Sequence, residues 1–177
     1  TDSGDAEGKV TATATVNTEK AAILKLLPQF TGDIQQIPPM HSALKRNGRP
    51  LYELARQGIE VEREARAVTI YAIDLLDFAG DSLTLRVACS KGTYIRTLGE
   101  DIGAALRCGG HLTRLRRMAT GPFGVAHCCS LAELEAMEES ARLACLLLPE
   151  ALLSDHTPIV LGGEDAGRFL SGMRRRG

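Results

Sequence analysis

The chain reads Val68-Thr-Ile-Tyr-Ala-Ile-Asp-Leu-Leu-Asp-Phe78, then Ala79-Gly80-Asp81-Ser82, then Leu83-Thr-Leu-Arg-Val-Ala-Cys89. The last part alternates apolar residues with Thr84, Arg86 and Ala88, which is typical of a half-buried strand. The first part predicts a second strand, and Gly80-Asp81 predicts a tight turn between them. We therefore expect an antiparallel hairpin over these residues.

Helical patterns flank the hairpin. After it, Thr93 is expected to cap a helix that extends to about Arg107, with its apolar residues on one face. Three further helices and a final short one are predicted: Thr18–Phe30 capped by Thr18, Leu51–Gln57, Leu131–Met137 capped by Ser130, and residues 165–170. Additional strands are predicted at Lys9–Val16, His111–Ala119 and Pro158–Leu161, whereas Ile34–Pro50 is expected to be irregular. The fold class is α+β, with a mixed, mostly antiparallel sheet flanked by helices.

Composition agrees with a folded domain. The chain has 177 residues, of which 44% are apolar, 24% charged and 4% aromatic, with no tryptophan. This balance predicts an aliphatic core in a globular protein. No apolar run approaches the roughly 18 residues of a membrane helix, and no signal segment opens the chain, so we expect no membrane association and a cytoplasmic protein.

The cysteines do not predict a disulfide framework or a metal centre. There are five of them, an odd number without regular spacing. Cys108 and His111 have C-x-x-H spacing, but no second pair follows at the spacing of a zinc finger. Clustered carboxylates and histidines are also lacking, which argues against a metal-dependent hydrolase. We expect no metal and unpaired thiols.

Positive charge is concentrated, although the formal net charge is only −1. The region from Arg86 to Arg117 contains Glu100 and Asp101 as its only acids. Its basic residues are Arg86, Lys91, Arg96, Arg107, Arg114, Arg116 and Arg117. Such a region can bind a phosphate backbone, but on charge alone a solvated, salt-bridged surface is an equally good interpretation.

Three collinear motifs favour the first interpretation. They are Ile37-Pro-Pro-Met-His-Ser-Ala-Leu-Lys-Arg-Asn-Gly-Arg-Pro-Leu-Tyr-Glu-Leu-Ala-Arg-Gln-Gly58, Cys89-Ser-Lys-Gly-Thr-Tyr-Ile-Arg-Thr-Leu98 and Leu115-Arg116-Arg117. In this order they closely resemble the bacterial tRNA pseudouridine synthases that modify uridine 55 in the T-loop. The similarity covers nearly the whole chain, including the polar opening segment Thr1–Gly8.

The resemblance implies a cofactor-free and metal-free isomerisation of uridine, with the T-stem-loop of tRNA as partner and no need for an oligomer. The family's essential aspartate lies in a Gly-Ala-Leu-Asp-Pro-type loop, which these 177 residues do not contain. We expect the N-terminus to be cut and this chain to be inactive by itself. The expected organisation is a partial catalytic domain over residues 1–156, an RNA-binding insertion over 34–58, and the beginning of a small C-terminal RNA-binding domain over 157–177.

The catalytic residues that the resemblance implies are Arg96, Tyr94 and Leu115. Arg96 matches the arginine that pairs with the catalytic aspartate and keeps it ionised. Tyr94 matches a pocket tyrosine, and Leu115 matches an apolar residue that packs against the flipped uracil. The alternatives are a surface arginine, a tyrosine at the edge of the core and an ordinary core leucine.

The RNA-binding residues come from the same motifs. His41 stands where the family commonly has tyrosine, and histidine can still stack or donate, with a smaller stacking area. The positions implied to contact RNA are His41, Ser42, Lys45, Arg46, Arg49, Lys91, Arg114, Arg116 and Arg117. Two other functions stay open: a non-catalytic RNA-binding module, and an α+β domain without any role in RNA.

Overall fold

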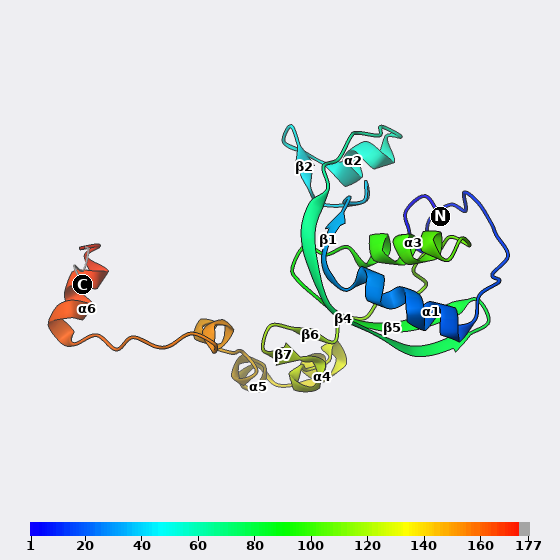
Figure 1. Cartoon of the computed structure of the whole chain (residues 1–177). Coiled ribbons are helices and arrows are strands. Elements are labelled where there is room, and N and C mark those ends of the chain that lie inside the picture. Colours follow the sequence, from blue (N-terminus) through cyan, green and yellow to red (C-terminus); the bar gives the residue numbers. More distant parts are fainter. Residues whose placement is uncertain (174–177) are drawn as a thin grey trace. The chain divides into compact units, whose positions relative to one another are not determined.

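A computed structural model describes residues 1–173, which form two compact units, Thr1–Leu115 and the residues from Arg116 onward. The first unit combines helices with an antiparallel sheet, which confirms the predicted α+β class (Figure 1). Its elements are α1 (Lys20–Leu26), the 3-10 helix η1 (Leu27–Phe30), β1 (Gly32–Gln36), β2 (Lys45–Arg46), β3 (Arg49–Pro50), α2 (Leu51–Arg56), β4 (Arg66–Ala79), β5 (Ser82–Cys89) and α3 (Ile95–Ala105).

The predicted hairpin is confirmed as β4 and β5, which pair antiparallel. Leu75 lies opposite Leu85, and the turn includes Gly80 at a φ of 65°, a left-handed conformation that glycine adopts without strain. On its other edge β4 pairs with β1, so the three-stranded sheet has the order β1-β4-β5. This pairing places Gln36 opposite Arg66, at the end of β1.

The core of the first unit lies between this sheet and two helices, α1 and α3, which Figure 1 shows on the same side of it. Its buried residues are all aliphatic, as the composition predicts: Ile23, Leu27, Ile70, Leu98 and Ile102. Full burial of such a side chain stabilises the fold by about 1.5–3 kcal/mol. The sheet and the core thereby fix α3, whose first turn carries Arg96.

The second unit is built from short elements, and none of its residues from Arg116 to Met173 is buried. The predicted Ser130 cap is confirmed, since Ser130 and Glu133 form a capping box. Among the helices of residues 1–173, none is long and apolar enough to cross a membrane. The elements are β6 (Ala119–Thr120), β7 (Phe123–Gly124), η2 (Val125–His127), α4 (Leu131–Ala136), α5 (Glu139–Ala144), η3 (Pro149–Leu153) and α6 (Gly163–Leu170).

Three predicted strands are wrong. Residues 9–16 are irregular and nearly all exposed, and residues 158–161 form no strand. In residues 111–119 only Leu112, which bridges Asp5, and Ala119, the first residue of β6, are paired within the described chain. Each segment has an extended pattern, but a strand also needs a neighbouring strand along its length to satisfy its backbone hydrogen bonds. The predicted final helix is present as α6, while residues 174–177 lie outside the described part.

The segment 34–50, expected to be irregular, contains the last three residues of β1 and the two short strands β2 and β3. β1 was hidden because its sequence Gly-Asp-Ile-Gln-Gln is mostly polar. β2 and β3 form a hairpin around Asn47 and Gly48, which have φ values of 52° and 80°. Asn-Gly is a strong local signal for this type of hairpin, so the turn could have been predicted. Two predicted caps also shift by one residue: Glu19 rather than Thr18 precedes α1, and Tyr94 rather than Thr93 precedes α3.

Candidate functional site

Arg96 joins three segments that are distant in sequence. From the first turn of α3, its Nη2 donates a hydrogen bond to the backbone carbonyl of His41 at 2.6 Å. Its Nη1 lies 3.4 Å from the carbonyl oxygen of Ser3 and donates to it. Two predicted site residues, Arg96 and His41, are therefore in direct contact, and the polar segment at the start of the chain is the third component of the site.

The opening segment is held against α3 and the residues after it. The backbone N–H of Leu112 donates to the carbonyl of Gly4 at 2.9 Å. Gly4 has a φ of 68°, and a Cβ added there would lie 2.9 Å from the carboxyl carbon of Glu100. The left-handed conformation favours glycine, and any larger residue would also displace the Glu100 carboxyl group. The close packing at Gly4 thus fixes Ser3 beside Arg96.

A surface pocket of about 390 Å³ lies where these segments meet. Arg96, Lys9 and His41 form part of the lining, together with three carboxylate residues of the opening segment. The guanidinium of Arg96 has five N–H donors, so its two contacts with carbonyl groups leave capacity for a further acceptor. The lining residues are Asp2, Ser3, Asp5, Glu7, Gly8, Lys9, His41 and Arg96.

Gln36 is a residue of the site that the sequence did not reveal. Its side chain is 2% exposed and binds both backbone groups of Tyr94. The N–H of Tyr94 donates to Oε1 of Gln36 at 2.7 Å, and Nε2 of Gln36 donates to the carbonyl of Tyr94 at 3.1 Å. This clamp fixes the residue before α3, two positions ahead of Arg96. No local pattern indicates a contact across 58 residues, so only the fold could show it.

The turn before α3 is fixed by hydroxyl groups. The N–H of Thr69 on β4 donates to Oγ of Ser90 at 2.9 Å, and Oγ1 of Thr93 donates to the carbonyl of Ser90 at 2.9 Å. Gly92, at a φ of 83°, permits the sharp change of direction between them. Lys91 is exposed at the tip of this turn, where its ammonium group is accessible to a ligand.

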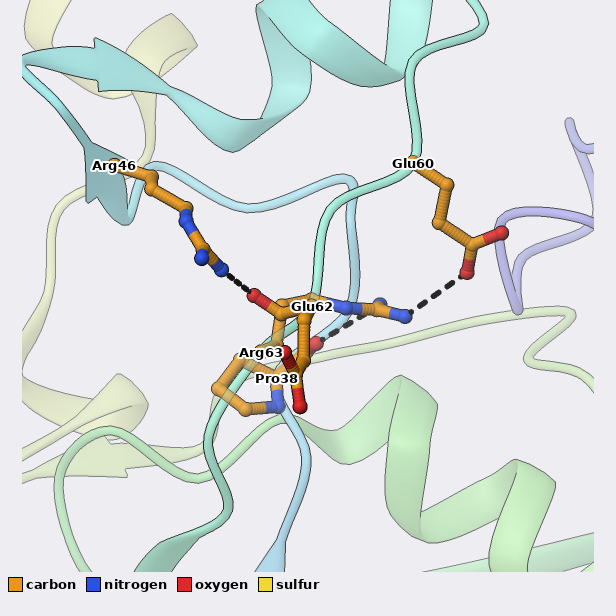
Figure 2. A network of polar contacts seen from close by, with 5 residues as sticks. All are labelled: Pro38, Arg46, Glu60, Glu62 and Arg63. Carbon is orange, nitrogen blue, oxygen red and sulfur yellow. Dashed lines mark hydrogen bonds and ion pairs between the residues drawn. The ribbon is translucent and has the colours of Figure 1, made fainter.

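Two arginines connect the insertion to the segment that leads into β4. Figure 2 shows Arg46 donating to the carbonyl of Glu62, and Arg63 donating to the carbonyl of Pro38 at 3.2 Å. Arg63 also forms an ion pair with Glu60 at 3.2 Å. These bonds hold both the entry and the hairpin of the insertion. Arg46, which was predicted to contact RNA, thus also holds the hairpin through its hydrogen bond to the carbonyl of Glu62.

The remaining predicted residues occupy four places. Lys45 and Arg49 are exposed on the β2–β3 hairpin, where Arg49 also donates to Oε1 of Gln57 at 3.2 Å. Ser42 is 5% exposed, and its hydroxyl has no hydrogen-bond partner within residues 1–173.

Leu115 is 66% exposed, so it is not an ordinary core leucine. Arg114 is exposed in the same irregular segment, while Arg116 and Arg117 belong to the second unit.

Two carboxyl groups of α3 have raised pKa values. Burial is the main cause at Glu100, where the charge of Asp101 also raises the pKa, and the N-terminal amino group and Arg96 oppose it. Burial also raises the pKa of Asp101. Glu100 is therefore a partly desolvated carboxylate beside Gly4 of the opening segment.

Within the described residues, no group of three or more His, Cys, Asp or Glu side chains is arranged to hold a metal ion. The donors at the pocket are a guanidinium, an ammonium, an imidazole and backbone groups, with carboxylates from one segment. At the Arg96 and Lys9 side of the pocket these donors can bind a carboxylate or a phosphate, whereas Asp2, Asp5 and Glu7 make the opening segment acidic.

Comparisons with known proteins identify the family of the chain. The TruB family pseudouridylate synthase (N terminal domain) matches residues 1–95, and the tRNA pseudouridylate synthase B C-terminal domain matches residues 96–154. The tRNA pseudouridine synthase B of Dechloromonas aromatica is 63% identical over 172 residues, covering 97% of this chain and 58% of the relative. That of Aromatoleum aromaticum is 52% identical, covering 97% and 56%. The chain thus spans a little over half the length of these relatives.

Two solved structures resemble the fold. A Cbf5–Nop10–Gar1 complex contains a chain that is 30% identical, with a TM-score of 0.56 over 72% of this chain and 37% of that one. An H/ACA RNP bound to a substrate RNA containing 2′-deoxyuridine contains a chain that is 26% identical, with a TM-score of 0.52 over 73% and 36%. Since the family match extends through the motifs that carry Arg96 and its partners, the chain belongs to the TruB family of pseudouridylate synthases.

Proposed function

We propose that this chain forms part of a tRNA pseudouridine synthase that isomerises uridine 55 in the T-loop of tRNA. The observation that carries the proposal is the convergence on Arg96 of two family motifs and the opening segment. The names of the curated relatives support tRNA as the substrate.

In this reaction the bond between uracil N1 and ribose C1′ breaks, the base rotates, and C5 bonds to C1′. C5 then loses its proton and N1 gains one, so that the product is an isomer of the substrate. An aspartate is the essential acid group of the family, and Arg96 is the residue that pairs with it. A guanidinium stabilises an ionised carboxylate. The guanidinium of Arg96 is itself positioned by its hydrogen bonds to the carbonyl groups of Ser3 and His41. Tyr94 and Leu115 complete the uracil pocket in this proposal.

The substrate uridine must leave its folded loop before reaction, at a cost of a few kcal/mol. Contacts between basic residues and phosphates offset that cost. The exposed positions of Lys45 and Arg49 on the hairpin, and of Lys91 beside α3, support this role. The hydroxyl of Ser42 is buried next to His41, so Ser42 would contact RNA only if this segment moves when RNA binds. Residues 34–58 are the insertion that closes over RNA, and residues 157–177 begin a C-terminal RNA-binding domain of a cytoplasmic enzyme.

These 177 residues contain no aspartate in a Gly-Ala-Leu-Asp-Pro-type context, so we expect them to bind tRNA without isomerising it. The direct test uses this chain and a chimera in which the N-terminal part of the Dechloromonas aromatica relative precedes residue 1. Each protein is incubated with an unmodified tRNA transcript, and pseudouridine is mapped by carbodiimide labelling and primer extension.

The chimera should form pseudouridine at position 55, and this chain alone should form none. Replacement of Arg96 by Lys in the chimera should reduce the rate at least about 100-fold, because Lys lacks the bidentate fork. Modification at another uridine would contradict the site assignment. Pseudouridine made by the chain alone would contradict its expected inactivity.

A further inference from the structure

Two thiols of the second unit lie within reach of each other. Sγ of Cys129 donates to Sγ of Cys145 across 3.7 Å, although the residues are 16 positions apart. A disulfide bond is about 2.05 Å long. The two sulfurs are therefore in contact, and a rearrangement that shortens this distance would allow a bond.

The local structure holds both residues in this arrangement. Cys129 directly precedes the capping box that begins α4, and Cys145 is the C-cap of α5. Sγ of Cys145 also donates to the carbonyl of Ala141 at 3.3 Å and lies 3.8 Å from Sδ of Met137. The turn between the helices is fixed by Arg142, whose Nε donates to the carbonyl of Met137 at 2.8 Å.

The other three cysteines have different surroundings. Cys128 directs its thiol to the carbonyl of Gly124 at 3.6 Å. Cys108 directs its thiol to the carbonyl of Gly109 at 3.4 Å, and Cys89 is half-buried in β5. Cys129 and Cys145 are both exposed, so a small oxidant can reach them. The geometry thus singles out one pair among five free thiols.

We propose that Cys129 and Cys145 are a modification site that forms a reversible disulfide by exchange with a low-molecular-weight disulfide such as oxidised glutathione. The thiolate of Cys145 attacks the glutathione disulfide and releases one glutathione thiol. The thiolate of Cys129 then attacks the sulfur of Cys145 and releases the second. The two protein thiols lose two electrons and two protons, and one glutathione disulfide becomes two glutathione thiols.

The product would link the start of α4 to the end of α5 and close a loop around both helices. The pKa of the Cys129 thiol is raised, first by its hydrogen bond with Cys145 and then by the charge of Cys145. Exchange requires the thiolate of each cysteine in turn, so the reaction is run at about pH 9, where a larger fraction of the thiols is deprotonated. Disulfides of this kind, formed by exposed pairs, are typically the labile and regulatory ones.

The test treats the whole chain with oxidised glutathione and maps the cysteines by mass spectrometry after blocking free thiols. Trypsin cleaves after Arg142 and separates the two cysteines, so the bridge joins peptide 118–142 to peptide 143–168. We expect this linked pair, a mass loss of about 2 Da and recovery of both thiols with dithiothreitol. Cys89 and Cys108 should remain at least tenfold less modified.

Three variants identify the sulfur atoms. Cys128→Ser should retain the linked peptides, while Cys129→Ser and Cys145→Ser should lose them. Retention of the link in Cys129→Ser would show that Cys128 is the partner and would overturn the proposal. A stable glutathione adduct without a link in the unmodified chain would also overturn it. None of these readouts depends on tRNA or on isomerase activity.

Discussion

The side-chain amide of Gln36, at the end of β1, pairs with both backbone polar groups of Tyr94, the residue that precedes α3. Because Tyr94 precedes Arg96 by two residues, this buried amide sets the position at which the helix begins. The sheet is thereby connected directly to the family motif that carries the arginine.

Replacing Gln36 with Leu should destabilise the first unit by about 2–4 kcal/mol, because two backbone groups of Tyr94 would lose their partners. Urea unfolding of the chain would measure this change. Gln35→Leu is the matched control, since Gln35 is exposed on the same strand and should change stability by less than about 0.5 kcal/mol. Equal effects of the two substitutions would contradict the role of the clamp.

Glu100 should make stability depend on pH. Its folded pKa is raised above the usual 4.5, mainly by burial. The folded state therefore binds this proton more tightly than the unfolded state does. The resulting contribution to the free energy of unfolding is fully present below the unfolded pKa and is lost as pH rises through the folded pKa. Glu100→Gln should increase stability at pH 7 relative to the unsubstituted chain and make little difference near pH 4.

Thermal unfolding of both proteins between pH 4 and 7 would test this sign. Glu64→Gln, at an exposed position, is the control and should shift stability equally at both ends of the range. A Glu100→Gln chain that is less stable at pH 7 would mean that the attraction between Glu100 and the N-terminal amino group outweighs its burial.

The capping box of α4 predicts an opposite dependence on pH. The hydrogen bonds with Ser130, from its side chain and then its backbone, lower the pKa of Glu133. Its contribution to helix stability is therefore present above the unfolded pKa and lost as pH falls through the folded pKa. Ser130→Ala should weaken the helix by about 1 kcal/mol at pH 7.

Amide hydrogen exchange over residues 131–136 would report the change at α4. Glu133→Gln is an informative companion, because Gln also completes a capping box but does not titrate. It should keep much of the protection and lose the dependence on pH. Unchanged exchange in Ser130→Ala would show that the cap does not stabilise this helix.

If Lys45 contacts a phosphate, removing its charge should lower the affinity for tRNA without changing the preference for one RNA sequence over another. Lys45→Gln on the β2–β3 hairpin should weaken tRNA binding and reduce the slope of log affinity against log salt by about 1. Lys20→Gln on α1 is the control at another exposed lysine. Filter binding at several salt concentrations measures both, and identical curves for the two variants would remove the hairpin from the proposed interface.

How far the sequence could predict this fold depended on whether each pattern was local. The β4–β5 hairpin and α3 were predicted correctly because alternation, a turn and a helical apolar face lie within short windows. β1 was missed because most of its residues are polar. Asp33 and Gln35 are exposed, and the buried Gln36 has its hydrogen-bond partner in Tyr94, far away in the sequence. The segments 9–16 and 111–119 were predicted as strands because period two is visible in a sequence, whereas the presence of a pairing edge is not.

The same distinction applies to the site. The family motifs predicted Arg96 and His41, and the fold places them in contact. The roles assigned to Tyr94, Leu115 and the basic residues remain predictions. Ser3 and Gln36 could not be found from spacing, since each meets α3 only after the chain has folded back over more than fifty residues.

The absence of buried side chains from Arg116 to Met173 has a consequence for how this chain tolerates substitutions. Helices of six to eight residues are marginal in water and depend on caps and neighbouring groups. Away from its caps, a substitution in that stretch therefore disturbs little packing within the chain. By contrast, Ile70 and Leu98 are closely packed and Gln36 is a buried polar residue, so smaller or apolar substitutes there would leave a void or unpaired backbone groups. Substitutions should accordingly be tolerated more readily in the second unit of this chain than around the helix that carries Arg96.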